Sequence, residues 1–498
     1  RVLDPSCGNG QFLRLHRAAV GVDISPSSCG DARLLAPEAV VHHADFFAWA
    51  ERTTERFDCI VGNPPFIRYQ NFSGEGRQRA LRLARRAGAD LSGLTSSWAP
   101  FIAAASTLLR PGGRMAFVVP GEIGHATYAE PLVEALCRSF ERVVIIAVKE
   151  KLFPDLSEDA WLLLTLGHGG KTDEIELVIW DEFQPFDEPP NPTKRVSLHQ
   201  WRAHGSRLRK FLFPDDVLDH YWGLHNGDSC PCLSDIARVG IGYVTGANDF
   251  FHLRPSEAGF FGIPSECLRP SIRKGDQLPE GEVTKGLVQA WLREDLPILL
   301  LDLAGRTDLP ESVKAYLDTP GGREARRTYK CRNRSPWYAV PDVVVPDAFL
   351  SYMIGEQASF VLNPAGCVCT NSVHAVRFTK SVVPCDVQSA WSHPLCILSQ
   401  EIEGHHLGGG LLKLEPREAG RVLLPLGSAA QRQVDLPLIH AAIELARSWR
   451  HYDNPFRNPK VRGLERAVWE SDSPALNEVR DTVGEDAHAG LGYVPRES

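Results

Sequence analysis

Short apolar segments alternate with amphipathic ones along the first 170 or so residues. The apolar runs Val2-Leu3, Val20–Asp23 and Phe57–Val61 predict buried strands. Ser96–Leu109 carries apolar side chains at helical spacing and predicts a helix, and a second helix is predicted over Gln11–Ala19. The alternation predicts a parallel α/β sheet. Further predicted elements are strands at Val40-Val41, Arg114–Val119, Val143–Val148 and Trp161–Leu166, a helix over Tyr128–Arg138, and a helix stop at Pro111-Gly112-Gly113.

The pattern changes after residue 180. Asp181–Lys194 is rich in proline and acidic residues and predicts a linker or long surface loop. From Leu233 to Leu426, short strand-like runs alternate with Gly and Pro breaks, which predicts a β-rich mixed domain. Ala429–Trp449 predicts a helix before a polar tail. We therefore expect an α/β domain over residues 1–180, a connecting region over 181–232, a second domain over 233–430, and a helical segment with a polar tail over 431–498.

Composition narrows the class of protein. The 498 residues are 43% hydrophobic and 23% charged, as in a globular protein of two or three domains. The absence of a run of about 18 apolar residues predicts no membrane span, so we expect a cytoplasmic chain. Twelve cysteines, including the Cys230/Cys232 and Cys367/Cys369 pairs, lack zinc-site spacing, and we expect reduced thiols and no metal. The net charge of −8 disfavours nucleic-acid binding unless basic residues cluster.

A glycine-containing loop follows the first strand. In the segment Asp4-Pro5-Ser6-Cys7-Gly8-Asn9-Gly10, two glycines allow a tight turn that can approach a ligand closely. Only Gly8 and Gly10 fit the dinucleotide-binding fingerprint, so the loop by itself could be an ordinary turn between a strand and a helix.

Acidic residues also end the next two predicted strands. Asp23, followed by Ile24, could accept the two hydroxyls of a ribose. Asp45 could accept an adenine amino group, while Phe46 offers a ring face. Each acid alone could be a helix cap or a surface charge. Acids at successive strand ends face one edge of a parallel sheet, where open α/β sheets bind ligands, so together with Asp4 they predict a nucleoside site.

The fourth predicted strand runs into Asn63-Pro64-Pro65-Phe66. Two prolines fix the backbone and remove two donors, so the Pro64 carbonyl can point outward beside the Asn63 side chain. Two acceptors can bind the two N–H groups of an aromatic amine and direct its lone pair at a methyl donor, while Phe66 supplies a flat surface. This turn predicts methyl transfer to a planar nitrogen.

On these motifs the chain resembles the gamma-class N6-adenine DNA methyltransferases of restriction-modification systems, including the methyltransferase part of type IIG enzymes. The resemblance implies a Rossmann-like sheet with helices on both faces, S-adenosylmethionine as cofactor, and a target-recognition domain over 233–430. It implies double-stranded DNA as partner, with a flipped adenine as substrate, and a cognate restriction endonuclease as a candidate partner of a monomeric enzyme. The matching segments are Asp4–Phe12, Gly21–Pro26, Asp45-Phe46, Asp58–Phe66, Leu109–Gly113, Phe117–Pro120 and Phe153-Pro154.

The resemblance also implies roles for individual residues. Asn63 and the Pro64 carbonyl would bind the target N6, Pro65 would rigidify the turn, and Phe66 would stack on the base. The expected cofactor-binding residues are Asp4, Ser6, Cys7, Gly8, Gly10, Asp23, Ile24, Asp45 and Phe46.

Three features depart from the family pattern. The chain begins at Arg1 inside a motif, and we expect the family's N-terminal segment upstream of it. Position 66 is Phe where Tyr is commoner. The second stacking aromatic has no clear equivalent; Trp161 could be that residue or a core tryptophan.

Two clusters of basic residues favour DNA over other acceptors. Each cluster could equally be a solvated face. The segments Gly242–Gly246 and Asn371–Phe378 also resemble the family's recognition domain. The clusters are Arg77, Arg79, Arg82, Arg85 and Arg86 after the N-P-P-F turn, and Arg323, Arg326, Arg327, Lys330, Arg332 and Arg334 beside Trp337 and Tyr338.

Other interpretations of the function stay open. The same tetrapeptide occurs in enzymes that methylate a protein glutamine or an RNA guanine, which are generally compact chains. Enzymes that act on cytosine N4 usually begin the tetrapeptide with Ser, so Asn63 favours adenine. A non-catalytic DNA-binding relic is a further alternative, against which the intact Asp23, Asp45 and Asn63 argue. No nuclease motif is evident in these residues, and a nuclease domain upstream of Arg1 is left open.

Overall fold

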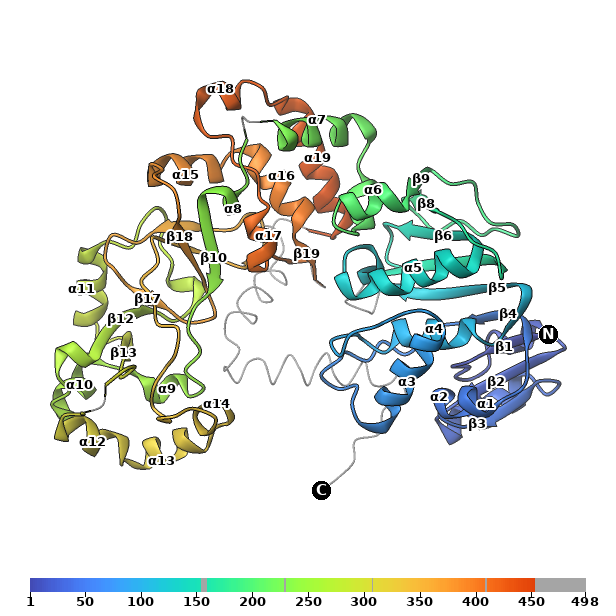
Figure 1. The fold of residues 1–498 in the computed structure, drawn as a ribbon, viewed down its shortest axis with the longest axis horizontal. Helices are drawn as coiled ribbons and strands as arrows, with labels where there is room; N and C mark the ends of the chain where they lie inside the picture. Colours follow the sequence, from blue (N-terminus) through green and yellow to red (C-terminus); the bar gives the residue numbers. More distant parts are fainter. Residues whose placement is uncertain (154–158, 228–229, 307, 408–409, 453–498) are drawn as a thin grey trace. The chain divides into compact units, whose positions relative to one another are not determined.

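The computed structural model describes residues 1–153, 159–227, 230–306, 308–407 and 410–452 (Figure 1). They divide into two compact units, one from Arg1 to Pro214 and one from Asp215 onward. Each unit is described by itself below. The polar tail and Pro154 of the Phe153-Pro154 segment lie outside the described residues.

The first unit is built on a nine-stranded sheet in the order β3-β2-β1-β4-β5-β7-β6-β8-β9. The strands from β3 to β5 are mutually parallel, as the alternating pattern predicts. β7 runs antiparallel between β5 and β6, and β9 is antiparallel to β8 at the edge. The strands are β1 (Val2–Asp4), β2 (Ala19–Asp23), β3 (Val40–His43), β4 (Phe57–Gly62), β5 (Leu109–Pro120), β6 (Phe140–Val148), β7 (Ala160–His168), β8 (Glu174–Trp180) and β9 (Lys194–Ser197).

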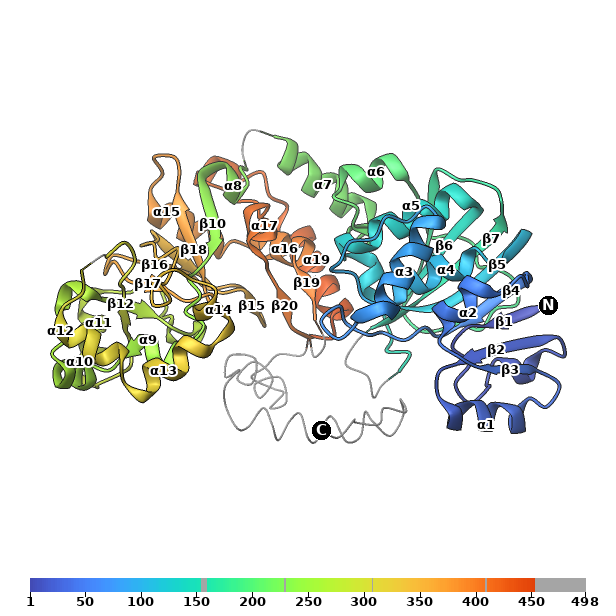
Figure 2. The same ribbon diagram turned by 60° about the horizontal axis from the view of Figure 1, so that its bottom comes forward.

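Helices cover both faces of this sheet. α1 packs against β2 and β3, while α2 to α5 pack in succession against one another on the opposite face (Figure 2). Every residue of α4 is buried, which explains its almost wholly apolar sequence. The helices are α1 (Pro26–Leu35), α2 (Phe46–Arg52), α3 (Gly74–Arg86), α4 (Trp98–Ser106), α5 (Glu130–Ser139) and α6 (Leu198–Ala203), with 3-10 turns η1 (Leu13–Leu15), η2 (Gly121–Gly124), η3 (Thr127–Ala129) and η4 (Leu208–Leu212).

Two local predictions were wrong. The helix expected over Gln11–Ala19 is only the short turn η1, because Leu13 is its one buried side chain and an isolated apolar residue cannot anchor a longer helix. The helix stop expected at Pro111-Gly112-Gly113 lies inside β5 instead. Gly112 has φ +75°, and the register with β4 shifts here, so the strand passes through an irregularity.

The stretch expected as a connecting region, residues 181–232, contributes to both units. Asp181–Lys194 forms the loop before β9, as its composition predicts. β9 then completes the first sheet, and α6 and η4 follow it within the same unit. α7 (Asp215–Asn226) opens the second unit. The two units therefore meet at Pro214 and Asp215, not at the expected boundaries of 180 and 233.

The second unit combines three small sheets with short helices, in agreement with the predicted rhythm of short strands and breaks. Their strand orders are β10-β18-β14-β16, β11-β13-β12-β17 and β15-β20-β19. The strands are β10 (Ala237–Ile241), β11 (His252–Leu253), β12 (Leu268–Ile272), β13 (Leu299–Leu301), β14 (Ala348–Leu350), β15 (Met353–Ile354), β16 (Phe360–Leu362), β17 (Val368–Cys369), β18 (His374–Phe378), β19 (His405–His406) and β20 (Leu412–Lys413).

The helices of the second unit surround separate apolar cores. The helix predicted over Ala429–Trp449 is divided: its first residues belong to α18 and the rest, from Leu436, form α19. Among the described helices, none is long and apolar enough to cross a membrane. Besides α7, the helices are α8 (Leu233–Ile236), α9 (Asn248–Phe251), α10 (Pro255–Phe261), α11 (Lys285–Arg293), α12 (Glu311–Leu317), α13 (Pro320–Arg327), α14 (Tyr329–Arg332), α15 (Pro384–Trp391), α16 (Pro394–Glu403), α17 (Pro416–Gly420), α18 (Gly427–Gln431) and α19 (Leu436–Trp449).

Candidate active site

The carboxyl ends of β1, β2 and β4 meet at one edge of the first sheet. β1 lies between the other two strands and is parallel to both. β1 ends at Asp4, β2 ends at Asp23, and β4 ends one residue before Asn63. The parallel sheet thus brings together three side chains that the sequence predicted to share a site.

Asp23 organises the loop after β1. One carboxylate oxygen accepts the Gly8 N–H at 2.9 Å and the other accepts the Ser25 N–H at 2.8 Å. A carboxylate has about four acceptor positions, so two stay available for the hydroxyls of a bound nucleoside. Ile24, which follows, is 69% exposed and presents an apolar surface beside these oxygens.

The glycines of this loop are needed for its shape. Gly8 and Gly10 have φ of +51° and +88°, which other residues adopt rarely. A Cβ at Gly10 would lie 3.0 Å from the Ala32 Cα, so the loop also packs closely on α1. Cys7 is buried, and the burial raises the pKa of its thiol, which leaves Cys7 a packing role with only its backbone near a ligand.

Asp4 is wholly buried, yet one of its oxygens has no hydrogen-bond partner among the described residues. The other oxygen accepts the Ser6 N–H at 3.2 Å. Burial, with a smaller contribution from the charge of Asp23, raises the pKa of Asp4 to about 7. A cationic group close to this oxygen would restore the ionised carboxylate. The site therefore suits S-adenosylmethionine, which carries both a sulfonium and an ammonium group.

Asp45 and Phe46 follow β3 at the start of α2. The Asp45 carboxylate caps the helix by accepting the Ala48 N–H at 2.8 Å, and it lies 3.9 Å from the Arg79 guanidinium. Phe46 is only 5% exposed, and its ring lies against Phe101 with centroids 4.4 Å apart. The Asp45 carboxylate can still accept a hydrogen bond from an adenine amine. Most of the Phe46 ring is already covered by the protein, which leaves little of it for the expected stacking.

The N-P-P-F turn presents two unused acceptors. Among the described residues, neither the Asn63 side chain nor the Pro64 carbonyl forms a hydrogen bond, and Asn63 is exposed. The Asn63 backbone carbonyl accepts the Ser6 hydroxyl at 2.9 Å, which ties this turn to the loop after β1. A Cβ at Gly62 would lie 3.1 Å from an Asp4 oxygen, so the two loops are also in close contact. The half-buried Phe66 lies next in the same turn.

Ser97 fixes the far side of the turn. Its hydroxyl donates to the Pro65 carbonyl and accepts the Ile67 N–H at 2.9 Å. Its own N–H donates to the Ile67 carbonyl at 2.9 Å. Ser97 precedes α4, but its side chain does not cap that helix. The sequence placed Ser97 inside the predicted helix Ser96–Leu109, and its contact with the turn, 30 residues away, appears only in the fold.

Trp161 belongs to the core. It is 1% exposed, the Arg209 guanidinium lies 5.0 Å from its ring centre, and a Cβ at Gly124 would clash with it. The structure thus favours a packing role for Trp161 in the core over a role in stacking on the base. Nearby, the Trp98 indole donates to the Tyr128 hydroxyl at 3.0 Å, and Tyr128 donates to Glu122, so these side chains are also held within the protein.

The first basic cluster is largely engaged inside the protein. Arg77 donates to the Phe72 carbonyl at 3.2 Å. Arg79 and Arg82 donate to the two carboxylate oxygens of Glu51, at 3.2 and 3.4 Å. These arginines join α3 to α2, so internal contacts account for much of their placement.

The second cluster divides into two groups. Arg334 is half-buried, and its guanidinium donates to the carbonyls of Val244 and, at 2.6 Å, Thr245. This pairing gives it a structural role, which the sequence analysis did not anticipate. Arg326, Arg327, Lys330 and Arg332 are exposed on α13 and α14 and stay available to an anionic partner.

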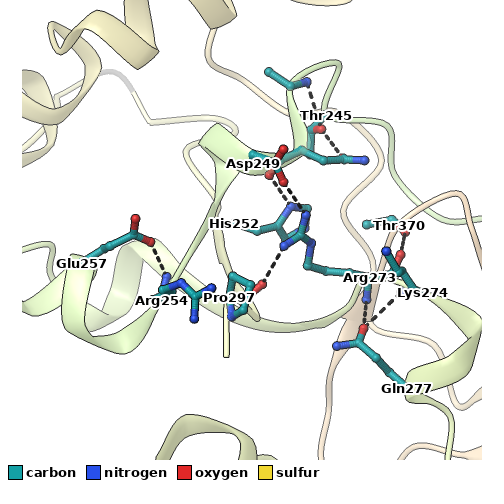
Figure 3. Close-up of polar contacts among 12 residues, drawn as sticks. Thr245, Asp249, His252, Arg254, Glu257, Arg273, Lys274, Gln277, Pro297 and Thr370 are labelled. Carbon is teal, nitrogen blue, oxygen red and sulfur yellow. Dashed lines mark hydrogen bonds and ion pairs between the residues drawn. The ribbon is translucent and has the colours of Figure 1, made fainter. Parts of the chain in front are cut away.

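The loop containing Gly242–Gly246 is held by polar contacts, of which Figure 3 shows those of Thr245 and those of the neighbouring His252 and Arg273. One ring nitrogen of His252 shares a hydrogen bond of 2.7 Å with the Tyr243 hydroxyl, and the other lies 2.8 Å from the Asn248 carbonyl. Burial lowers the pKa of His252 to about 4. Arg273 donates to Asp249 at 2.9 Å. A Cβ at Gly246 would lie 2.5 Å from the Lys330 Cβ, so this loop packs closely against α14.

A Rossmann-like sheet with the glycine loop, Asp23, Asp45 and the N-P-P-F turn on one edge defines an S-adenosylmethionine-dependent methyltransferase. Residues 26–153 match the family model described as Eco57I restriction-modification methylase. Residues 206–453 match the model of the type II methyltransferase M.Eco57I, C-terminal domain. The chain belongs to the Eco57I restriction-modification methylase family. Its cofactor is S-adenosylmethionine, as the sequence predicts.

Individual relatives are distant. The type II methyltransferase M.AccI of Acinetobacter calcoaceticus is 21% identical over 75% of this chain and 70% of its own length. The type II methyltransferase M.TthHB8I of Thermus thermophilus is 32% identical, over 36% of this chain and 42% of its own length. The structure of the type IIL restriction-modification enzyme MmeI in complex with DNA aligns with 100% of this chain and 71% of that chain, at 13% identity and a TM-score of 0.49.

Proposed function

We propose that this chain methylates the exocyclic N6 amine of adenine at a specific site in double-stranded DNA. The observation that carries the proposal is the pair of free acceptors, the Asn63 side chain and the Pro64 carbonyl, at the sheet edge that holds Asp4 and Asp23. Membership of a restriction-modification methylase family supports DNA as the acceptor.

The residues at this edge divide the work between cofactor and substrate. Asp23 and Asp45 would hold the ribose and adenine of S-adenosylmethionine, whose sulfonium supplies an electrophilic methyl group. Asn63 and Pro64 accept the two N–H groups of the target amine and turn its lone pair toward that methyl group. Because the backbone of the turn is held by Ser6 and Ser97 before substrate binds, little reorganisation of the turn is needed during transfer.

Access to the amine requires the base to leave the duplex, because N6 is paired inside it. We infer that the target adenine rotates out and lies on Phe66, next to the two acceptors. The second unit, from Asp215 onward, would recognise the surrounding sequence, and the exposed side chains of α13 and α14 would contact phosphates. The predicted monomeric state and the cognate endonuclease stay predictions.

Mapping the modified bases in DNA from cells that express the full-length gene tests this proposal. We expect N6-methyladenine at one recurring sequence. Methylation only of cytosine N4 would contradict the assignment of adenine, and methylation of RNA or of a protein glutamine without any in DNA would contradict the assignment of DNA.

A further inference from the structure

Two arginines that lie far apart in the sequence stand directly opposite each other in the second unit. β10 and β18 are antiparallel neighbours, and Arg238 of β10 is the register partner of Arg377 of β18. Partners in an antiparallel pair point to the same face, with Cβ atoms about 5 Å apart. Both side chains are exposed. Like charges in this position destabilise a sheet.

Neither member of this pair is engaged by the described part of the chain. Neither arginine forms a hydrogen bond or an ion pair with any described residue. The register of β14 and β18 continues to Asp347, just before β14, and places it beside Arg377. Its carboxylate accepts the Phe378 N–H at 2.8 Å and forms no ion pair with Arg377. The arginines of α3, in contrast, are paired with Glu51. Both guanidinium groups are therefore free of ion pairs, in a row that holds two arginines and one carboxylate.

The surface around the pair is open to a ligand. Gly240 lies two residues after Arg238, on the same face, and a Cβ built there would meet no atom within 4 Å. A glycine in a strand often marks a place where another molecule approaches the backbone. Thr379, two residues after Arg377, is also exposed and adds a hydroxyl on this face. β10 is an edge strand of its sheet.

Along the strands, this face passes from the exposed arginines to a buried apolar core. Ala375, the register partner of Gly240, belongs to a buried apolar core together with Phe349. The arginines stand at the end of the face that this core does not cover. The site therefore offers two guanidinium groups on neighbouring strands, with a hydroxyl and an open backbone beside them. Groups of this kind bind phosphate oxygens.

We infer that Arg238 and Arg377 form a phosphate clamp that grips the backbone of the DNA duplex. This inference rests on the proposed function, since it takes DNA as the substrate. A phosphate placed between the two guanidinium groups would remove their mutual repulsion, so binding converts an unfavourable pair into a favourable triplet. The clamp positions the duplex without reading its sequence, because phosphates are the same at every base pair.

The test measures the affinity of the whole chain for duplex DNA over a range of salt concentrations. The variants are Arg238→Gln, Arg377→Gln and the double variant. Each lost phosphate contact lowers the slope of log affinity against log salt by about 1, so the double variant should lose about 2. Affinity should fall to the same degree for DNA with and without the methylation site, because phosphate contacts carry no sequence information.

Two controls separate the clamp from a general effect of charge or folding. Arg293→Gln removes an exposed arginine of α11 whose bond in the described part of the chain is to its own helix, at the Gln289 carbonyl, 3.3 Å away; this variant should leave the slope unchanged. The double Arg238→Lys and Arg377→Lys variant keeps both charges and should restore most of the slope. The melting temperature of the glutamine double variant should not fall, since that variant relieves a repulsion.

The outcomes distinguish this inference from the proposed function. If the wild-type chain methylates DNA but the glutamine double variant keeps its salt slope, the clamp is refuted and the proposed function stands. A lower melting temperature with an unchanged slope would likewise refute it, by showing a structural role. If the wild-type chain does not bind DNA, the proposed function falls and the clamp with it.

Discussion

The contact between Ser97 and the N-P-P-F turn leads to the sharpest mutational prediction. Ser97→Ala removes two hydrogen bonds, one to the Pro65 carbonyl and one from the Ile67 N–H, and keeps the backbone bond between Ser97 and Ile67. Each side-chain bond is worth about 1 kcal/mol. If the turn uses this energy to hold its acceptors in place, the loss of about 2 kcal/mol corresponds to a kcat about 30-fold lower.

The assay is single-turnover methylation of duplex DNA with saturating cofactor. Cofactor affinity, measured by calorimetry, should not change, because the Ser97 hydroxyl bonds to Pro65 and Ile67 and, among the described residues, to no expected cofactor-binding residue. Ser97→Thr retains a hydroxyl and should recover most of the rate. Ser106→Ala is a matched control, since Ser106 is a buried serine at the end of α4, the helix that Ser97 precedes, and its hydroxyl donates to the Ala103 carbonyl at 2.8 Å.

The reasoning would be refuted if Ser97→Ala methylated DNA at the wild-type rate. An equal loss of rate in Ser97→Ala and Ser106→Ala would also refute it, because the effect would then come from weakening α4 and not from the turn.

Three further predictions follow from the site. Asn63→Ala should lower kcat at least 100-fold, by the usual cost of losing a preorganised group, while calorimetry finds cofactor binding intact; equal loss of both would contradict the role given to Asn63. Burial raises the pKa of Asp4 from 3.8 to about 7. The unfolded chain therefore releases this proton at lower pH than the folded chain, so the contribution of Asp4 to the free energy of unfolding falls as pH rises between those two values. Asp4→Asn should therefore flatten the decline in denaturation midpoint of the cofactor-free protein between about pH 4 and about pH 7, and an unchanged decline would argue against it. Arg334→Ala should lower the melting temperature because two backbone carbonyls lose their donor, without changing the salt slope of DNA binding; a changed slope with an unchanged melting temperature would show that Arg334 contacts DNA.

Much of the first unit was predictable because its strands are buried runs and its ligand-binding residues follow strand ends. Asp4, Asp23 and Asn63 could be placed at one edge from the parallel topology alone. The misplaced helix at Gln11–Ala19 shows the limit of this approach, since helix length depends on how many side chains the rest of the fold covers, and only Leu13 is covered.

The contacts that the sequence could not reveal join residues far apart in the chain. Arg238 and Arg377 become neighbours only through the register of β10 and β18, and neither lies in a basic run. Arg334 lies in a basic run that suggested phosphate binding, yet it bonds two carbonyls of a distant loop. A basic run gives the charge of a segment, and the fold decides which members face solvent.

The most direct test of the central claim is the identity of the methylated base. DNA from cells that express the full-length gene, and the same gene carrying Asn63→Ala, would be digested to nucleosides and analysed by mass spectrometry alongside a sequence map of the modified positions. We expect N6-methyladenine at one recurring sequence with the wild-type gene and none above background with the variant. N4-methylcytosine without N6-methyladenine, or N6-methyladenine that persists in the variant, would contradict the account.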